Sequence, residues 1–226
     1  MREYIGDYLE EYEKMPLFYG INRQDLLPML QCLGAYIRTF DKEEYIIFCE
    51  DSVKCISVVL EGTVHMIKED LWGNQSILAT MQEHDLFGET FACGDYNAAT
   101  VSFIATEPVK ALFLPFEKVM HSCTRSCAFH HRLIENMVRL VANKNVHLME
   151  KLDVVTKKTL REKILSYLSF QASEAGSGYF TIPLGRVALA NYLCADRSAL
   201  TRELTQMKKE GLIDFEKNTY KILKSV

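Results

Sequence analysis

The stretch LANYLCADRSALTREL, residues 189–204, predicts two short helices separated by a tight turn. On the second helix, Leu200, Leu204 and Met207 recur at i, i+4 and i+7, which is the spacing of a buried helical stripe. At about 100° per residue, the opposite face then carries hydroxyl and cationic side chains. The residues on that face are Ser198, Arg202, Thr205 and Lys209. The pattern therefore predicts a helix that presents polar and positively charged groups to solvent.

The composition is that of a globular protein, because 48% of the 226 residues are hydrophobic and 25% are charged. This length suits one large domain or two ordinary ones. The net charge of −4 is unevenly distributed along the chain. Residues 154–226 hold 12 Lys and Arg against 7 Asp and Glu, a net charge of +5 that leaves −9 for the rest. Only the C-terminal part is therefore expected to meet a polyanion.

The N-terminal segment MREYIGDYLEEYEKM is acidic and lacks the apolar core of a signal peptide. No apolar run approaches the ~18 residues of a membrane span. We therefore expect a cytoplasmic protein with no membrane partner. The seven cysteines are scattered, without a CxxC pair or zinc-ligand spacing, so neither disulfides nor a metal site are expected.

Residues 36–116 predict an all-β barrel or roll, preceded by short helical pieces around residues 25–30. Turn signals at Glu61-Gly62, Gly73-Asn74 and Gly94-Asp95 separate short β-rich runs, a spacing typical of such folds. The runs are YIIF (45–48), CISVVL (55–60), TVHMI (63–67), SILAT (76–80), TVSFIA (100–105) and KALFL (110–114). A β domain followed by helices implies at least two domains.

Residues 129–155 contain neither Gly nor Pro and predict one long helix. Apolar residues alternate steps of four and three along it, with Asn145 at a heptad a position, which favours a two-stranded parallel coiled coil. The predicted dimer seam is Ile134, Val138, Val141, Asn145, Leu148 and Leu152. A second stripe, Leu133, Met137 and Leu140, is available to pack inward. The alternative is a single amphipathic helix packed on its own domain.

The tail predicts a winged helix. Its expected elements are a helix at 159–173, a strand at 180–182, a helix at 184–193 opened by Pro183, a helix capped by Asp196 and ended by Gly211, and a hairpin of LIDF and YKIL joined across EKNT. Cys194, in the turn between the two central helices, is interpreted as a packed small residue. The alternative is an arbitrary small α+β domain.

These residues resemble the Crp/Fnr family of bacterial transcription regulators over nearly the whole chain. IPLGRVALANYLCADRSALTRELTQMKKEGLIDF is similar to the family's helix-turn-helix, and LEGTVHM followed by HDLFGE is similar to its cyclic-nucleotide-binding β-roll. The resemblance implies an α+β chain with three parts. These are a sensor domain with a jelly-roll-like double-stranded β-helix (1–127), a dimerisation helix (128–155) and a winged helix-turn-helix (156–226). It also implies a homodimer that binds an inverted-repeat DNA operator, with RNA polymerase as a further partner.

A helix of this kind reads base edges with its N-terminal residues. Arg202 is the predicted base reader, because the arginine fork pairs with guanine O6 and N7, while Arg197 is expected to reach a guanine or the phosphates. Ser198 lies where many relatives carry an acid, so the target is expected to differ at that step. The predicted further contacts, chiefly to phosphates, are Thr201, Thr205, Lys208 and Lys209. For Lys208 and Lys209 the alternative is a solvated helix end.

The predicted effector pocket consists of Phe87, Gly88, Glu89, Ala99 and Thr100. In cyclic-nucleotide binders of this family a Gly-Glu pair holds the ribose, and an Arg-Ser pair about ten residues later neutralises the phosphate. Here the later position reads Asn97-Ala98-Ala99-Thr100, and no Lys or Arg occurs from residue 83 to 109. A buried phosphate without a cationic partner is costly, so cyclic AMP is not the expected effector. Glu89 is alternatively a structural acceptor of backbone N–H groups.

The identity of any cofactor stays open at this stage. The chain lacks the N-terminal cysteine cluster that holds an iron–sulfur centre in some relatives, and Cys123 with Cys127 suits at most a redox trigger. Haem bound through His65, His84 or His121 is a further cofactor alternative.

The alternative function is a ligand- or redox-sensing module that acts on protein partners. An enzyme is not expected, because the sequence has no nucleophile elbow, phosphate-binding glycine loop or metal-ligand spacing.

Overall fold

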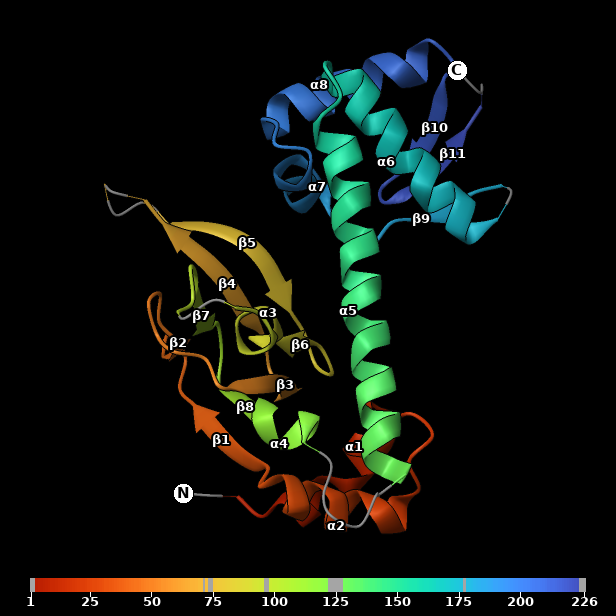
Figure 1. The fold of residues 1–226 in the computed structure, drawn as a ribbon. Helices are drawn as coiled ribbons and strands as arrows, with labels where there is room; N and C mark the ends of the chain where they lie inside the picture. Colours follow the sequence, from red (N-terminus) through yellow and green to blue (C-terminus); the bar gives the residue numbers. More distant parts are fainter. Residues whose placement is uncertain are drawn as a thin grey trace. The chain divides into compact units, whose positions relative to one another are not determined.

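The computed structural model describes residues 3–70, 72, 75–95, 98–121, 128–176 and 178–223. The chain divides into two compact units, Met1–Leu140 and Val141–Val226. The long helix α5 (Ala128–Val155) contributes residues to both (Figure 1). Within the described residues, no helix is long and apolar enough to span a bilayer.

The first unit begins with short helices, η1 (Ile5–Tyr8), α1 (Leu9–Lys14), η2 (Pro16–Phe18) and α2 (Arg23–Leu33). The sequence predicted only short helical pieces around residues 25–30, whereas α2 is one continuous helix that includes Pro28. Four buried side chains, Leu26, Met29, Leu30 and Leu33, hold α2 on the core despite the proline. The helix ends at Gly34, whose φ of 66° is the left-handed conformation that glycine adopts readily.

Two antiparallel four-stranded sheets form the roll that the sequence predicted. Their strands are β1 (Tyr36–Phe40), β2 (Tyr45–Ile47), β3 (Cys55–Glu61), β4 (Val64–Glu69), β5 (Gln75–Met81), β6 (Leu86–Phe87), β7 (Ser102–Ala105) and β8 (Val109–Pro115). The strand orders are β1-β8-β3-β6 and β2-β7-β4-β5. Two short helices, α3 (Glu89–Cys93) and α4 (Phe116–Met120), complete this part of the unit. Strands β1 and β6 were absent from the runs expected individually.

Strand β3 separates two hydrophobic clusters because its side chains alternate between the faces of the sheet. Ile56, Val58 and Leu60 lie in a cluster with the helices, whereas Val59 lies in the cluster between the two sheets. The interior cluster is rich in phenylalanine and contains Phe40, Phe87, Phe91, Phe103 and Phe113. The phenylalanine side chains thus occupy much of the interior of the roll.

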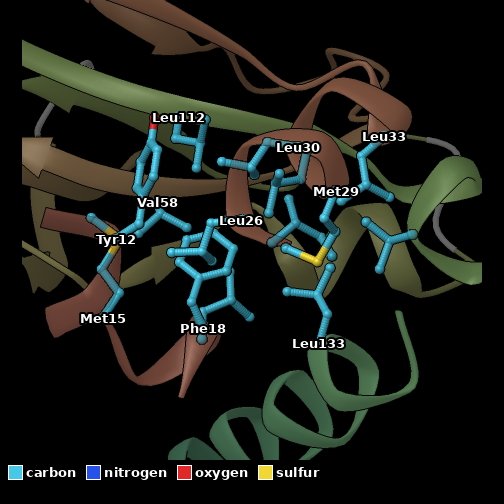
Figure 2. Close-up of a cluster of buried hydrophobic side chains, with 14 of the residues drawn as sticks. Tyr12, Met15, Phe18, Leu26, Met29, Leu30, Leu33, Val58, Leu112 and Leu133 are labelled. Carbon is cyan, nitrogen blue, oxygen red and sulfur yellow. The ribbon is translucent and has the colours of Figure 1, made fainter. Parts of the chain in front are cut away.

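The N-terminal part of α5 is anchored in the helical cluster of the first unit. Leu133 and Met137 are buried there, as the second stripe predicted, and Leu133 projects toward Met29 of α2 (Figure 2). The buried Asn136 side chain donates to the carbonyl oxygens of Leu17 at 3.0 Å and Tyr19 at 2.7 Å. These bonds fix the register of the helix against the segment that follows α1.

The second unit is a winged helix, formed by α6 (Leu160–Ala175), β9 (Phe180–Thr181), α7 (Arg186–Tyr192), α8 (Arg197–Lys209), β10 (Ile213–Glu216) and β11 (Thr219–Ile222). The three strands have the order β10-β11-β9. Thr159 and Glu162 form a capping box at the start of α6, which begins one residue after the predicted limit. The core is built around fully buried side chains such as Leu193, Leu200, Leu204, Met207 and Tyr220.

Three local predictions in this unit need correction. Helix α7 begins at Arg186 rather than residue 184, because the extended Gly185 is its N-cap. Asp196 occupies the N-cap position of α8, but its side chain makes no capping hydrogen bond. The hairpin turn is confined to residues 217 and 218, where Lys217 adopts φ of 52°.

Candidate nucleic-acid interface

The turn between α7 and α8 is a Schellman motif with a cysteine in place of the usual glycine. The Cys194 N–H donates to the Asn191 carbonyl at 3.1 Å, and the Ala195 N–H donates to the Ala190 carbonyl at 2.9 Å. Cys194 has φ of 52° and an exposed side chain. The prediction of a packed small residue is therefore wrong: the thiol faces solvent, and the backbone is in a region that L side chains disfavour.

Helix α8 has one buried face and one exposed face. Leu200, Leu204 and Met207 are fully buried, as the sequence predicted. The predicted contact residues all lie on the exposed part of the helix: Arg197, Ser198, Thr201, Arg202, Thr205 and Lys209. The first four of these lie within its N-terminal six residues. The helix therefore offers cations and hydroxyls to an external partner.

The cations of α8 differ in what they contact. Within the described residues, the side chains of Arg197, Arg202 and Lys209 form no hydrogen bond or ion pair. Lys208, in contrast, pairs with Asp214 at 2.6 Å and donates to the Phe215 carbonyl at 2.9 Å. Lys208 thereby joins the end of α8 to the wing hairpin, and it lowers the pKa of the Asp214 carboxyl.

The two threonines on this face direct their hydroxyl hydrogens to their own helix. The Thr201 hydroxyl donates to the Arg197 carbonyl at 2.9 Å, and the Thr205 hydroxyl donates to the Thr201 carbonyl at 2.8 Å. In these rotamers neither hydroxyl has a hydrogen to donate to a phosphate. Each oxygen can still accept a hydrogen bond, and the threonine methyl groups are available for apolar contact.

Arg161 on α6 holds α8 from its other side, a role that the sequence analysis missed. Its Nε donates to Glu203 at 2.6 Å, and its Nη1 donates to Glu210 at 2.7 Å. Glu210 first, and Glu203 second, raise the pKa of the arginine. The seven-residue spacing of the two glutamates, which places them on one helix face, was the available signal for a cationic partner.

Arg186, the first residue of α7, was also missed. Its guanidinium donates to the Tyr220 hydroxyl and, at 3.2 Å, to the Lys217 carbonyl. It lies 4.8 Å from the centroid of the Phe215 ring. Burial lowers its pKa. Arg186 thus connects the first helix of the pair to the wing hairpin, so α7, α8 and the hairpin are mutually braced.

The predicted effector residues lie around the start of α3. Phe87 and Ala99 are buried in the phenylalanine-rich interior, and Thr100 is exposed. Gly88 has φ of 75°, and Glu89 is the buried first residue of α3. The backbone of Ala99 pairs with the loop after β2, accepting from Glu50 at 2.7 Å and donating to Asp51 at 2.8 Å. Ala99 thus places a buried methyl group beside this loop.

Two of the histidines that were named as haem alternatives have polar neighbours on the chain. The His121 Nδ1 lies 2.7 Å from the Glu117 carbonyl, and the His84 Nε2 lies 3.6 Å from Glu11. Across the described ranges, no group of three or more His, Cys, Asp or Glu side chains is placed to hold a metal. Cys123 and Cys127 lie outside the described residues.

The C-terminal part of the predicted dimer seam is exposed on the single chain. Val138, Val141, Leu148 and Leu152 are between 41% and 58% exposed, and Asn145 is exposed too. Ile134 is partly buried against the first unit's helical cluster.

Comparisons with known proteins agree with both halves of this description. Residues 37–126 match the family model of the cyclic nucleotide-binding domain, and residues 162–224 match that of the Crp-like helix-turn-helix domain. The chain is 22% identical to the transcriptional activator protein FnrA of Stutzerimonas stutzeri, over 94% of this chain and 85% of that protein.

Solved structures share the fold. The catabolite activator protein of Thermus thermophilus is 21% identical, with a TM-score of 0.52 over 92% of this chain and 93% of that one. CprK complexed with OCPA is 16% identical, with a TM-score of 0.68 over 89% of this chain and 92% of that one. With a cyclic-nucleotide-binding-type domain preceding a Crp-like helix-turn-helix, the chain belongs to the Crp/Fnr family of DNA-binding transcription regulators, which are not enzymes.

Proposed function

We propose that this protein is a homodimeric, sequence-specific regulator whose helix α8 enters the major groove of an inverted-repeat operator. The observation that carries the proposal is the N-terminal part of α8, where Arg197 and Arg202 are exposed and free of partners within the described residues. The same helix is immobilised from behind by Arg161. A helix that is held in place and whose arginine guanidinium groups are unpaired is suited to bidentate recognition of guanine.

The proposed roles differ along the helix. Arg202 reads a guanine, and Arg197 contacts a guanine or the phosphates. Ser198 accepts or donates at a neighbouring base. Thr201 and Thr205 offer methyl groups and acceptor oxygens, because their hydroxyl hydrogens are engaged. Lys209 contacts phosphate, which contributes affinity without sequence information.

The proposed dimer forms through α5. An isolated chain leaves the apolar side chains Val138, Val141, Leu148 and Leu152 exposed in heptad register. A second copy of the same helix would cover them, and Asn145 at an a position favours two strands in register. We assign residues 1–127 to sensing, 128–155 to dimerisation and 156–226 to DNA binding, in a cytoplasmic protein that also contacts RNA polymerase.

The effector is proposed not to be cyclic AMP. The sequence has no Lys or Arg from residue 83 to 109, and the buried Ala99 lies in the cluster that contains the interior phenylalanines. A cyclic phosphate there would lose water without gaining a charged partner. Cyclic AMP at millimolar concentration should leave the melting temperature and the DNA affinity unchanged, and a clear stabilisation would contradict this assignment.

Selection from a pool of random duplexes tests the proposed function as a whole. The purified protein should enrich an inverted repeat with half-sites about 34–36 Å apart, roughly one helical turn. Binding to the enriched duplex should weaken steeply with salt, because cations on the protein displace counterions from DNA. If the protein acts only on protein partners, no duplex will be enriched and no salt-dependent DNA affinity will be measured.

A further inference from the structure

A cavity of the first unit is lined by residues other than the predicted effector residues. It has a volume of 280 Å³ and lies against β1, β2, β3 and β8 and the connection between β2 and β3. Tyr36, Ile47, Val53, Cys55, Ser57 and Phe113 are among its lining residues. Phe87, Gly88, Glu89, Ala99 and Thr100 do not line it.

Ser57 is a fully buried polar residue in the lining of this cavity. Its side chain is fully buried on β3, opposite Phe87 of β6 on one side and Phe113 of β8 on the other. Its Oγ has no hydrogen-bond partner among the described residues. A buried hydroxyl without a partner is costly, so such groups are rare unless a ligand or water satisfies them.

The walls around Ser57 favour a ligand with a flat, apolar ring. The rings of Tyr36 and Phe113 stack with centroids 5.2 Å apart and planes 7° apart. The Tyr36 hydroxyl lies 3.7 Å from the Cys55 Sγ, which leaves a soft, polarisable thiol at the wall. Ile47 and Val53 add aliphatic surface to the lining. Aromatic and aliphatic walls with one buried hydroxyl are typical of sites for small apolar ligands.

The rim of the cavity does not select a charged ligand. Asp51 and Lys54 both line it and carry opposite charges. Asp51 is engaged locally, since its Oδ2 accepts from the Phe48 N–H at 2.9 Å. The volume is slightly smaller than the range of about 300–1,000 Å³ that is typical of drug-sized pockets. The volume restricts the ligand to a small molecule, and the two opposite charges at the rim sum to zero, which favours an uncharged one.

We propose that this cavity binds an uncharged single-ring aromatic molecule with one hydroxyl-like group, which hydrogen-bonds to Ser57, and that this molecule is the effector. The role of this molecule as the effector rests on the proposed function. The cavity walls lie close to the start of α3, because a Cβ added to Gly88 would be 3.3 Å from Ile47 Cδ1 and 3.5 Å from Val53 Cγ1. Filling the cavity therefore acts directly on the segment that carries Gly88 and Glu89.

Binding is tested on the full chain with phenol and toluene, which differ by the hydroxyl. Wild type should bind phenol saturably by calorimetry. Ser57→Ala should bind phenol about fivefold more weakly, the value of one net hydrogen bond, and bind toluene as wild type does. The matched variant Ser52→Ala changes a serine at the rim and should alter neither ligand. Absence of saturable phenol binding, or equal weakening of both ligands by Ser57→Ala, would overturn the site.

Thiol protection locates the ligand independently of any substitution. Phenol should slow alkylation of Cys55, measured by peptide mass mapping, and leave the exposed Cys32 of α2 unaffected. Equal effects at both cysteines would contradict binding in the cavity. Because Cys32 lies outside the cavity lining, it serves as the internal control for direct reaction of the reagent with phenol.

Measurements of DNA affinity distinguish a failure of the proposed ligand site from a failure of the proposed function. Affinity for the enriched operator is measured with and without saturating phenol. A change in wild type that Ser57→Ala shifts to higher phenol concentration supports the effector role. Phenol binding without any change in DNA affinity overturns that role. No phenol binding by a chain that binds DNA normally overturns the site and leaves the proposed function intact. Phenol binding by a chain without DNA affinity overturns the proposed function and, with it, the effector role.

Discussion

Arg161 on α6 donates from its Nε to Glu203 on α8 at 2.6 Å, while the other end of its guanidinium reaches Glu210. One side chain therefore fixes two points of α8 on the side away from the free arginines. Arg161 is a positioning residue in this account, because it holds the helix without contacting the proposed DNA.

Replacing Arg161 with Met should lower DNA affinity for all sequences alike, because α8 loses its fixed position while its base-reading side chains stay. The ion pairs are partly exposed, so the change in melting temperature should be small and should shrink at high salt. Arg161→Lys, which keeps the charge but not the fork, should restore only part of the affinity. A variant that changes the preferred sequence instead would contradict a positioning role.

Leu148→Asp should convert the dimer to a monomer, because it places a charge in the proposed seam of α5. Val146→Asp is the matched control: Val146 is 52% exposed on the same helix but lies at a heptad b position, outside the seam. Sedimentation should show a monomer for the first variant and a dimer for the second. If both variants sediment like wild type, the seam is assigned to the wrong face.

Cys194→Gly should stabilise the second unit by about 0.5–1 kcal/mol. The left-handed conformation costs an L residue about 1–2 kcal/mol, which glycine avoids. About half of that gain is lost again, because glycine makes the unfolded chain more flexible and so raises the entropy cost of folding. Cys194→Ala removes the thiol but keeps the backbone cost, so urea unfolding should leave it close to wild type. Equal stabilisation by Ala and Gly would show that the thiol, not the backbone, is responsible.

The stability of the first unit should decrease as the pH falls below 6.5 because of His130. This residue is buried on α5, and neither ring nitrogen has a hydrogen-bond partner within the described residues. Burial first, and the charge of His131 second, lower its pKa from 6.5. The unfolded chain therefore binds more protons, and the free energy of unfolding falls as the pH drops from 6.5 toward the lower folded-state pKa.

His130→Phe should remove this part of the pH dependence, whereas His147→Phe should not, since His147 is exposed on the same helix. Chemical unfolding of the three proteins between pH 7.5 and 5 measures the difference. A wild-type slope that persists unchanged in His130→Phe would show that other groups cause it.

The sequence was most informative where a local pattern and the buried face coincide. Leu200, Leu204 and Met207 predicted the orientation of α8 because helical period alone decides which side is buried. Gly211 likewise predicted the end of α8, where its left-handed φ of 70° closes a Schellman motif. Both features depend on neighbours within a few residues.

Features that depend on distant partners could not be predicted in the same way. Strand β1 exists because it pairs with β8, about 70 residues later, and the Arg161 contacts depend on how α6 packs on α8. Cys194 misled the analysis because its small side chain suggests packing, whereas the turn orients it to solvent. The cavity at Ser57 arises from four strands and has no signature in the sequence.

Duplex selection with Arg202→Ala beside Lys209→Ala tests whether the start of α8 reads DNA. We expect Arg202→Ala to lose about 1–3 kcal/mol of binding and to relax the preference at one guanine per half-site. Lys209→Ala should instead weaken all duplexes alike and reduce the salt slope by about one per site lost. An Arg202→Ala protein that keeps the wild-type sequence preference would contradict the claim.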